Sequence, residues 1–310
     1  MIRKIFNTVL LAACLLTVFY AINGTKIFLD TTPTGGDMAG HVWWPAYLRD
    51  HLLPSGRVSG WTMDFYGGFP AGQFYFPLPA LIIVALNTVL PYGIAFKLGA
   101  VLGTALIPVA AMSFAKNMRW REPAPQLAAV GATWFIMFSG ETEKLAFNQR
   151  ISGGTLASML VGEFSYGWAV MFMLFGLGFL RRSLREGRGG WVAALCFWAV
   201  IWCHVIVAIM AAVLAVVIVL IEVARKPKPE VISKGIVIGA AGGLAAGMWF
   251  LPFFLRWETW TTAVRYEKIV SHGGANAASP GPADFMFTDW FRFPAIIAVF
   301  GLGAWVALAF

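Results

Sequence analysis

Apolar and polar positions alternate along the chain in long blocks, and these blocks predict helices that cross a membrane. Runs of apolar residues are separated by short segments that are charged or rich in Gly and Pro. A helix needs roughly 20 apolar residues to cross the hydrocarbon core of a bilayer. We therefore predict eight crossings, near residues 5 to 24, 94 to 115, 124 to 139, 166 to 180, 191 to 205, 206 to 223, 235 to 255 and 291 to 310.

Basic residues orient these predicted helices. Four basic clusters separate the apolar runs, namely Arg3-Lys4, Lys116 to Glu122, Arg181 to Arg188 and Ala224 to Lys234. Because Lys and Arg accumulate in cytoplasmic loops, we place all four clusters and the N-terminus in the cytoplasm. This layout requires the apolar run from Trp191 to Val223 to be two helices that meet near His204. One long tilted helix is the alternative.

Three segments then face the outside, at about residues 25–93, 140–165 and 257–290. In the first, "HVWWPAYLRDHLL" is amphipathic and predicts a helix along the membrane surface, and "YFPLPALIIVALNTVLP" predicts an interfacial or re-entrant helix. The fold class is therefore an all-α polytopic helix bundle of about eight crossings, forming one transmembrane domain over residues 1–310. The chain stops inside an apolar run, which favours a truncated C-terminus.

Composition narrows the class of protein further. Hydrophobic residues make up 59% of the chain, charged residues only 12%, and the mean hydropathy is +0.73. This balance excludes a soluble globular domain and favours a multi-pass protein of the cytoplasmic (inner) membrane. The net charge of +8 comes from short scattered clusters, so we expect no nucleic-acid partner. Cys14, Cys196 and Cys203 lie in apolar runs without metal-site spacing and are predicted to be small core residues.

The stretch "TTPTGGDMAGHVWWP" carries the first candidate for chemistry. Asp37 follows two glycines soon after the first predicted helix. It is either an Asx turn or N-cap of a helix beginning near His41, or a base at the outer membrane face, with or without a metal. His41 lies four residues on and shares the side of Asp37 if the helix starts that early. Otherwise His41 is a solvated interface residue.

Two further stretches contain candidate residues. In "RISGGTLASMLVGEFSYGW", Glu163 precedes a predicted helix, where a carboxylate either complements the helix dipole or has a functional role. Arg150 either holds a phosphate or pairs with Glu141 or Glu143. His204, in "WCHVIV", is ionisable in an apolar neighbourhood, which indicates either function or a hydrogen bond to a helix carbonyl.

Five motifs occur in the order "GGDMAGHVW", "DFYGGFPAGQFYFPLPALI", "RISGGTLASMLVGEFSYGW", "CHVIVA" and "GMWFLPFFLR". This series resembles bacterial and archaeal membrane proteins with a 6-pyruvoyl-tetrahydropterin synthase-related domain. These in turn look like the GT-C glycosyltransferase superfamily, with oligosaccharyltransferase catalytic subunits, protein mannosyltransferases and aminoarabinose transferases. We do not expect pterin chemistry, because the soluble synthase needs three zinc-binding histidines. The four histidines here are spread from His41 to His272.

The resemblance implies an enzyme that moves a sugar from a polyprenyl-phosphate carrier to a glycan, lipid or protein acceptor on the outer face. An acidic residue in the first outer loop is the catalytic hallmark of that superfamily, and Asp37 matches its position. Many relatives carry two acids there, whereas this chain has one. As a hypothesis, Asp37 is the base and Glu163 binds acceptor hydroxyls or helps to hold a divalent metal, Mg²⁺ or Mn²⁺. The candidate substrate-binding residues are His41, Tyr66, Arg150, His204 and Arg265.

A different class of function stays open beside the enzyme. The same architecture suits a non-catalytic scaffold or a transporter of lipid-linked glycans. Transporters place charged groups at mid-membrane and contain internal repeats. His204 is the one ionisable residue in its 30-residue neighbourhood, and no repeat is visible in the sequence, so we favour the enzyme.

Overall fold

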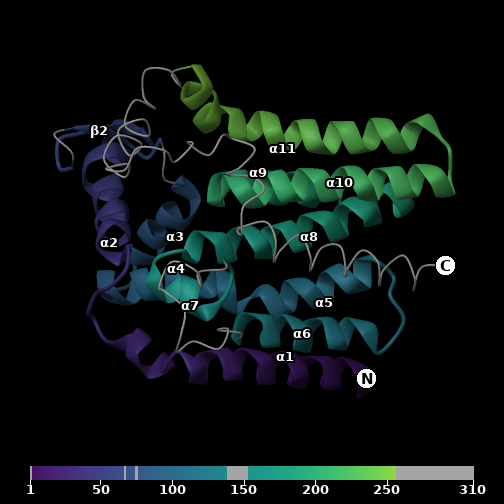
Figure 1. The fold of residues 1–310 in the computed structure, drawn as a ribbon, viewed down its shortest axis with the longest axis horizontal. Helices are drawn as coiled ribbons and strands as arrows, with labels where there is room; N and C mark the ends of the chain where they lie inside the picture. The colour runs from purple at the N-terminus through teal and green to yellow at the C-terminus, as the bar shows by residue number, and fades with distance from the viewer. Residues whose placement is uncertain (1, 66–67, 74–75, 138–152, 256–310) are drawn as a thin grey trace, which may run out of the picture. The chain divides into compact units, whose positions relative to one another are not determined.

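The computed structural model describes residues 2–65, 68–73, 76–137 and 153–255 (Figure 1). The chain divides into two compact units, Met1–Phe250 and Leu251–Phe310, and the description below concerns the first. The predicted crossing near 291 to 310 and the third outer segment lie outside the described residues. So do Tyr66, Arg150 and Arg265.

The described residues are mostly helical, with one short hairpin. In chain order, the long elements are α1 (Ile2–Ala21), α2 (Met38–Tyr47), α3 (Pro77–Asn87), α4 (Tyr92–Ala105), α5 (Ile107–Asn117), α6 (Ala124–Met137), α7 (Leu156–Val161), α8 (Phe164–Glu186), α9 (Gly190–Cys203), α10 (Val205–Arg225) and α11 (Pro229–Leu255). Short turns are the 3₁₀ helices η1 (Gly24–Phe28) and η3 (Leu53–Ser55) and the π-helix η2 (Leu48–Leu52). The strands β1 (Gly60–Thr62) and β2 (Phe69–Ala71) pair antiparallel, with Gly60 opposite Ala71. The all-helical prediction did not include this hairpin.

Five helical segments among the described residues are long and apolar enough to cross a membrane. They are Arg3–Ala21, Tyr92–Asn117, Phe164–Glu186, Val205–Arg225 and Pro229–Gly247. The shorter apolar helices are α3, α6 and α9. A membrane protein with several candidate spans is therefore supported, and the full set of eight crossings stays a prediction.

Two helix boundaries have clear local causes. The segment Tyr92–Asn117 consists of α4 and α5, which meet at Leu106. Pro108 lies in the first turn of α5, where its missing N–H costs nothing. The predicted break near His204 is confirmed, because α9 ends at Cys203 and α10 begins at Val205. His204 itself is extended, with φ −167° and ψ 120°.

The helices approach one another through small residues. A Cβ atom added at Gly103 of α4 would lie 2.5 Å from Cγ of Trp168 in α8, and one added at Gly167 would lie 2.1 Å from Oγ1 of Thr104. The indole Nε1 of Trp168 donates to the carbonyl of Gly99 at 2.7 Å. Small residues allow this close packing of helices in an apolar environment. The three cysteines are buried and free, as the sequence predicted.

Ion pairs bring the basic clusters to one end of the unit, which we call the basic end. Arg3, at the start of α1, pairs with Glu122, before α6, at 3.1 Å. Arg119, after α5, pairs with Glu186 at the end of α8 at 2.6 Å. The end of α8 is joined to the end of α10 by the ion pairs of Arg181 and Arg185 with Glu222. In Figure 1 the N-terminus and the C-terminal ends of α5, α8 and α10 lie at this end. The prediction that the four clusters share one side of the membrane agrees with this grouping.

The connecting segments that carry Asp37, Glu163 and His204 lie at the other end, which we call the loop end. The side chain of Gln73, just after β2, donates to the carbonyl of Trp249 in α11 at 3.1 Å. The Trp249 indole donates back to the carbonyl of Gly72 at 2.6 Å. The ammonium of Lys97 in α4 donates to the carbonyls of Lys26 and Leu29 in and after η1. These hydrogen bonds attach the segment between α1 and α3 to α4 and α11.

Candidate functional site

Asp37 occupies the residue before α2, and its side chain is exposed. The helix begins at Met38, three residues before the predicted start at His41. Within the described part of the chain, the Asp37 carboxylate accepts no capping hydrogen bond from this helix. The N-cap interpretation therefore loses its physical basis, because a capping carboxylate binds a free N–H of the first turn. The Asp37 carboxylate is open for other contacts.

The first and second glycine-rich segments meet through backbone contacts at Asp37. The Asp37 N–H donates to the carbonyl of Val161, the last residue of α7, at 2.8 Å. Gly36 has φ +53°, and a Cβ there would lie 2.4 Å from the same carbonyl oxygen. Only glycine permits this approach without displacing the backbone. Segments far apart in the sequence are thus held together at the start of α2.

Gly162 lies directly against the side chains of this turn. Its φ is +126°, and an added Cβ would lie 2.8 Å from Cδ2 of His41 and 3.1 Å from Cβ of Asp37. Asp37 and His41 are one helical turn apart, and the His41 N–H donates to the Asp37 carbonyl at 3.2 Å. Because Glu163 follows Gly162, the structure brings Asp37, His41 and Glu163 together. We call these three residues the carboxylate site.

Glu163 is half-buried at the start of α8. Its side chain does not cap that helix, and its Oε2 is buried without a hydrogen-bond partner among the described residues. Thr155, by contrast, caps α7 by accepting a bond from the Ser158 N–H at 3.3 Å. Burial, with a smaller contribution from the negative charge of Asp37, raises the pKa of Glu163 to about 7. A carboxyl with this pKa exchanges protons near neutral pH.

His41 is half-buried between α2 and α8. Its ring lies edge-on to Phe164, with ring centroids 5.1 Å apart, and lines a small cavity with Trp44, Phe76 and Phe164. Burial lowers the pKa of His41 to about 4, although the charge of Asp37 acts in the opposite direction. The imidazole is therefore neutral at neutral pH. A role for His41 in holding a phosphate then rests on hydrogen bonding and not on positive charge.

His204 lies in a second group of rings. Its ring stacks on Phe76 at 5.0 Å and meets Tyr166 edge-on at 4.9 Å. Its Nδ1 is buried and has no hydrogen-bond partner in the part of the chain that the structure describes. Tyr166 lies in the first turn of α8, where its N–H donates to the Glu163 carbonyl at 3.2 Å. Tyr166 thus joins the two groups of residues, through its ring to His204 and through its backbone to Glu163.

Sequence reasoning missed two residues that shape this site. The role of Gly162 was not predicted, because the surrounding residues "LVGEF" contain no turn motif. A glycine directly before a carboxylate at the start of a predicted helix could have indicated it. Tyr166 lies three residues after Glu163, and that spacing on a helix was its signal. The metal hypothesis gains no support here, since no three His, Cys, Asp or Glu side chains of the described residues are grouped to hold an ion.

Comparison of the sequence with known families identifies the family of this chain. The sequence pattern of the 6-pyruvoyl-tetrahydropterin synthase related domain, described as a membrane protein, matches residues 73–281. The chain belongs to this family. The matched range contains Glu163 and His204 but begins after Asp37 and His41. No curated protein matches the chain. Membership of this family shows that the chain is a membrane protein.

Proposed function

We propose that this protein is a membrane glycosyltransferase of the GT-C type. It moves a hexosyl or pentosyl group from a polyprenyl-phosphate donor to an acceptor on the extracytoplasmic face. The observation that supports this proposal is the contact of the two glycine-rich segments, which brings Asp37 close enough to Glu163 for its charge to act on the Glu163 carboxyl. Paired carboxyl groups in different environments are suited to acid–base work on hydroxyl groups.

In the proposed reaction, the exposed Asp37 carboxylate takes the proton of the acceptor hydroxyl. The acceptor oxygen forms a bond to the anomeric carbon of the donor, while the bond from that carbon to the phosphate oxygen breaks. The polyprenyl phosphate leaves with the electron pair of the broken bond. The configuration at the anomeric carbon inverts in this single displacement.

In this scheme Glu163 acts as a hydrogen-bond donor. With a pKa of about 7, a substantial fraction of Glu163 is protonated at neutral pH and can donate a hydrogen bond. That hydrogen bond stabilises either the leaving phosphate or an acceptor oxygen. The neutral His41 supplies a further hydrogen bond beside it. Arg150 and Arg265 remain hypotheses for the phosphate charge. A Mg²⁺ or Mn²⁺ ion that neutralises the phosphate is likewise still a hypothesis.

A second candidate function is a non-catalytic scaffold or a transporter of lipid-linked glycans. The single acid in "GGD" and the absence of a grouped metal site among the described residues favour it. Two observations weigh against it: the Asp37 carboxylate does not cap its helix, and Glu163 is half-buried with no hydrogen-bond partner for its Oε2 among the described residues. A scaffold needs neither feature, so the enzyme is the better account.

The test uses the full-length protein in lipid with a panel of radiolabelled polyprenyl-phosphate sugars. We expect Asp37→Asn to lower transfer or donor hydrolysis by about 10²- to 10⁴-fold, the usual contribution of a general base. Asp64→Asn is the matched control, because Asp64 lies in the same segment and accepts a hydrogen bond from Trp43 at 2.9 Å. That control should keep its turnover. Donor binding without turnover in every protein, unchanged by Asp37→Asn, would favour the scaffold or transporter.

A further inference from the structure

A second cavity lies at the basic end, far from the carboxylate site in the fold. It has a volume of about 470 Å³ and is lined by Arg119, Leu184, Arg185, Glu222, Arg225, Lys226 and Val231. Four of these seven residues are cationic and one is acidic. We call this cavity the basic pocket. It lies where α8 and α10 end and α11 begins.

The one carboxylate of the pocket does not neutralise its cations. Glu222 is buried, and both of its oxygens are taken, by Nε of Arg181 at 2.9 Å and by Nε of Arg185 at 2.8 Å. The neighbouring Glu186 pairs with both Arg119 and Arg182. Each of these acids is therefore already paired with two arginines, and among the described residues that line the pocket the cations outnumber the acids. Like charges held this close repel one another unless an anion lies between them.

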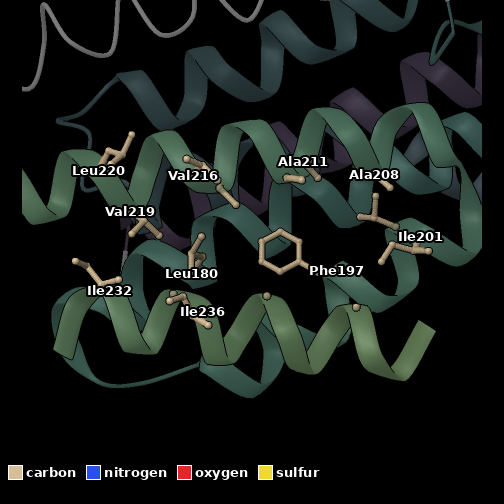
Figure 2. Close-up of a pocket in the computed structure, with 16 residues that line it drawn as sticks. Leu180, Phe197, Ile201, Ala208, Ala211, Val216, Val219, Leu220, Ile232 and Ile236 are labelled. Carbon is tan, nitrogen blue, oxygen red and sulfur yellow. The ribbon is translucent and has the colours of Figure 1, made fainter. Parts of the chain in front are cut away.

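An apolar groove begins one helical turn away from the basic pocket. It has a volume of about 330 Å³ and lies between α8, α9, α10 and α11 (Figure 2). Leu180 of the groove is one turn before Leu184 of the pocket on α8, and Ile232 of the groove adjoins Val231 of the pocket on α11. The two cavities thus line up along the same helices. Figure 2 shows Val219 of α10 on the side toward α11, opposite Ile232.

The walls of the groove are more exposed than a closed core allows. Val216 is 57% exposed, Leu220 60% and Ile236 64%. Such side chains gain free energy when apolar chains cover them. Gly235, Gly239 and Gly243 line the groove on α11 and place no side chains in it. A Cβ added at Gly239 would meet no atom within 4 Å. The groove is open beside Gly239 and Gly243, whereas at Gly235 an added Cβ would lie 2.8 Å from Val219 of α10.

We propose that the basic pocket and the apolar groove together form a binding site for an anionic phospholipid. Its phosphate lies among Arg119, Arg185, Arg225 and Lys226, and one acyl chain lies in the groove. Guanidinium groups bind phosphate oxygens in a forked geometry, and basic pockets between membrane helices bind anionic headgroups. Because the charged pocket continues into the apolar groove, the site favours a lipid over free phosphate. Free phosphate has no apolar chain to bury in the groove. This site is independent of the proposed transfer reaction.

The test is native mass spectrometry of the delipidated full-length protein titrated with three probes. These are phosphatidylglycerol, phosphatidylcholine with the same acyl chains, and glycerol phosphate. We expect phosphatidylglycerol to bind at least 10-fold more tightly than either of the others. Phosphatidylcholine tests the headgroup charge, and glycerol phosphate tests the need for the acyl chains. Equal binding of the two lipids, or equal binding of glycerol phosphate and phosphatidylglycerol, would overturn the proposal.

Two pairs of variants locate the site. Arg225→Gln with Lys226→Gln should weaken phosphatidylglycerol binding by about 30-fold, since each cation near an anionic headgroup contributes about 5-fold. Arg188→Gln with Lys228→Gln removes the same charge from exposed positions that do not line the pocket, and should change binding less than 3-fold. An equal loss of binding in the two double variants would mean that lipid binding depends only on the net charge of the protein. That result would overturn the placement of the headgroup in the basic pocket.

A variant in the groove tests the acyl-chain half of the proposal without touching a charge. Gly239→Leu fills open space on the α11 wall and should lower phosphatidylglycerol binding at least 5-fold. Gly131→Leu is its control, because Gly131 lies on α6, outside the groove, and also has open space around its Cα. Unchanged lipid binding in Gly239→Leu would overturn the placement of the acyl chain.

Discussion

Two glutamates at opposite ends of the helices have opposite surroundings. Glu222, at the basic end, is buried and bound by Arg181 and Arg185. Glu163, at the loop end, is half-buried, has no ion pair among the described residues and lies near the like charge of Asp37. A paired buried acid is suited to holding helices together, whereas an unpaired acid beside another carboxylate carries a cost in stability. The difference indicates where this chain supports structure and where it supports chemistry.

The largest expected effect in this comparison belongs to Glu222. Glu222→Gln removes the buried negative charge that pairs with Arg181 and Arg185, so the free energy of unfolding should fall by about 3–5 kcal/mol. Unfolding of the full-length protein in mixed micelles measures this. The control is Glu230→Gln in the exposed first turn of α11, expected to cost at most about 1 kcal/mol. Similar losses for the two variants would remove the structural role of the basic end.

The next effect comes from Gly162, which joins the two segments of the carboxylate site. Gly162→Ala places a Cβ on a residue with φ +126° and 2.8 Å from the His41 ring, so it should cost about 1–3 kcal/mol. It should also lower transfer, because Asp37 and His41 must move away. Gly131→Ala, in open space on a helix, is expected to be neutral or slightly stabilising. Full turnover in Gly162→Ala would show that this contact does not hold the site.

A smaller effect separates true helix caps from the candidate carboxylates. Thr155→Ala removes the bond to the Ser158 N–H and should cost about 1 kcal/mol. Asp37→Ala should change the free energy of unfolding by less than about 0.5 kcal/mol, because its carboxylate caps nothing in the described structure. Thermal unfolding monitored by circular dichroism compares the two. A loss for Asp37→Ala equal to that for Thr155→Ala would restore the capping interpretation.

Much of the fold followed from the sequence because it depends on local patterns. The basic clusters lie between apolar runs, and their grouping at one end follows from helices that traverse the unit in alternating directions. The break at His204 followed from the length of the apolar run around it. The pairing of His41 with Asp37 needed only the four-residue spacing of a helix. These features require no knowledge of contacts between distant segments.

The rest of the site depends on contacts between segments that no local pattern specifies. The bond from the Asp37 N–H to the Val161 carbonyl joins two loops through backbone atoms, which carry no residue identity. The raised pKa of Glu163 comes mainly from burial, and burial depends on how α2 and α8 pack. The β1–β2 hairpin was missed because its strands are only three residues each. Tertiary packing decides all three.

Infrared titration of the Glu163 carboxyl tests the central claim, that the two glycine-rich segments form one site, without the need for a substrate. Wild-type spectra are compared with those of Glu163→Gln to assign the band, and the titration is repeated in Asp37→Asn. We expect Glu163 to titrate near pH 7, and its pKa to fall when the Asp37 charge is removed while burial still keeps it above the ordinary value. A Glu163 carboxyl that titrates near its ordinary pKa of about 4.3 and does not respond to Asp37→Asn would contradict the account.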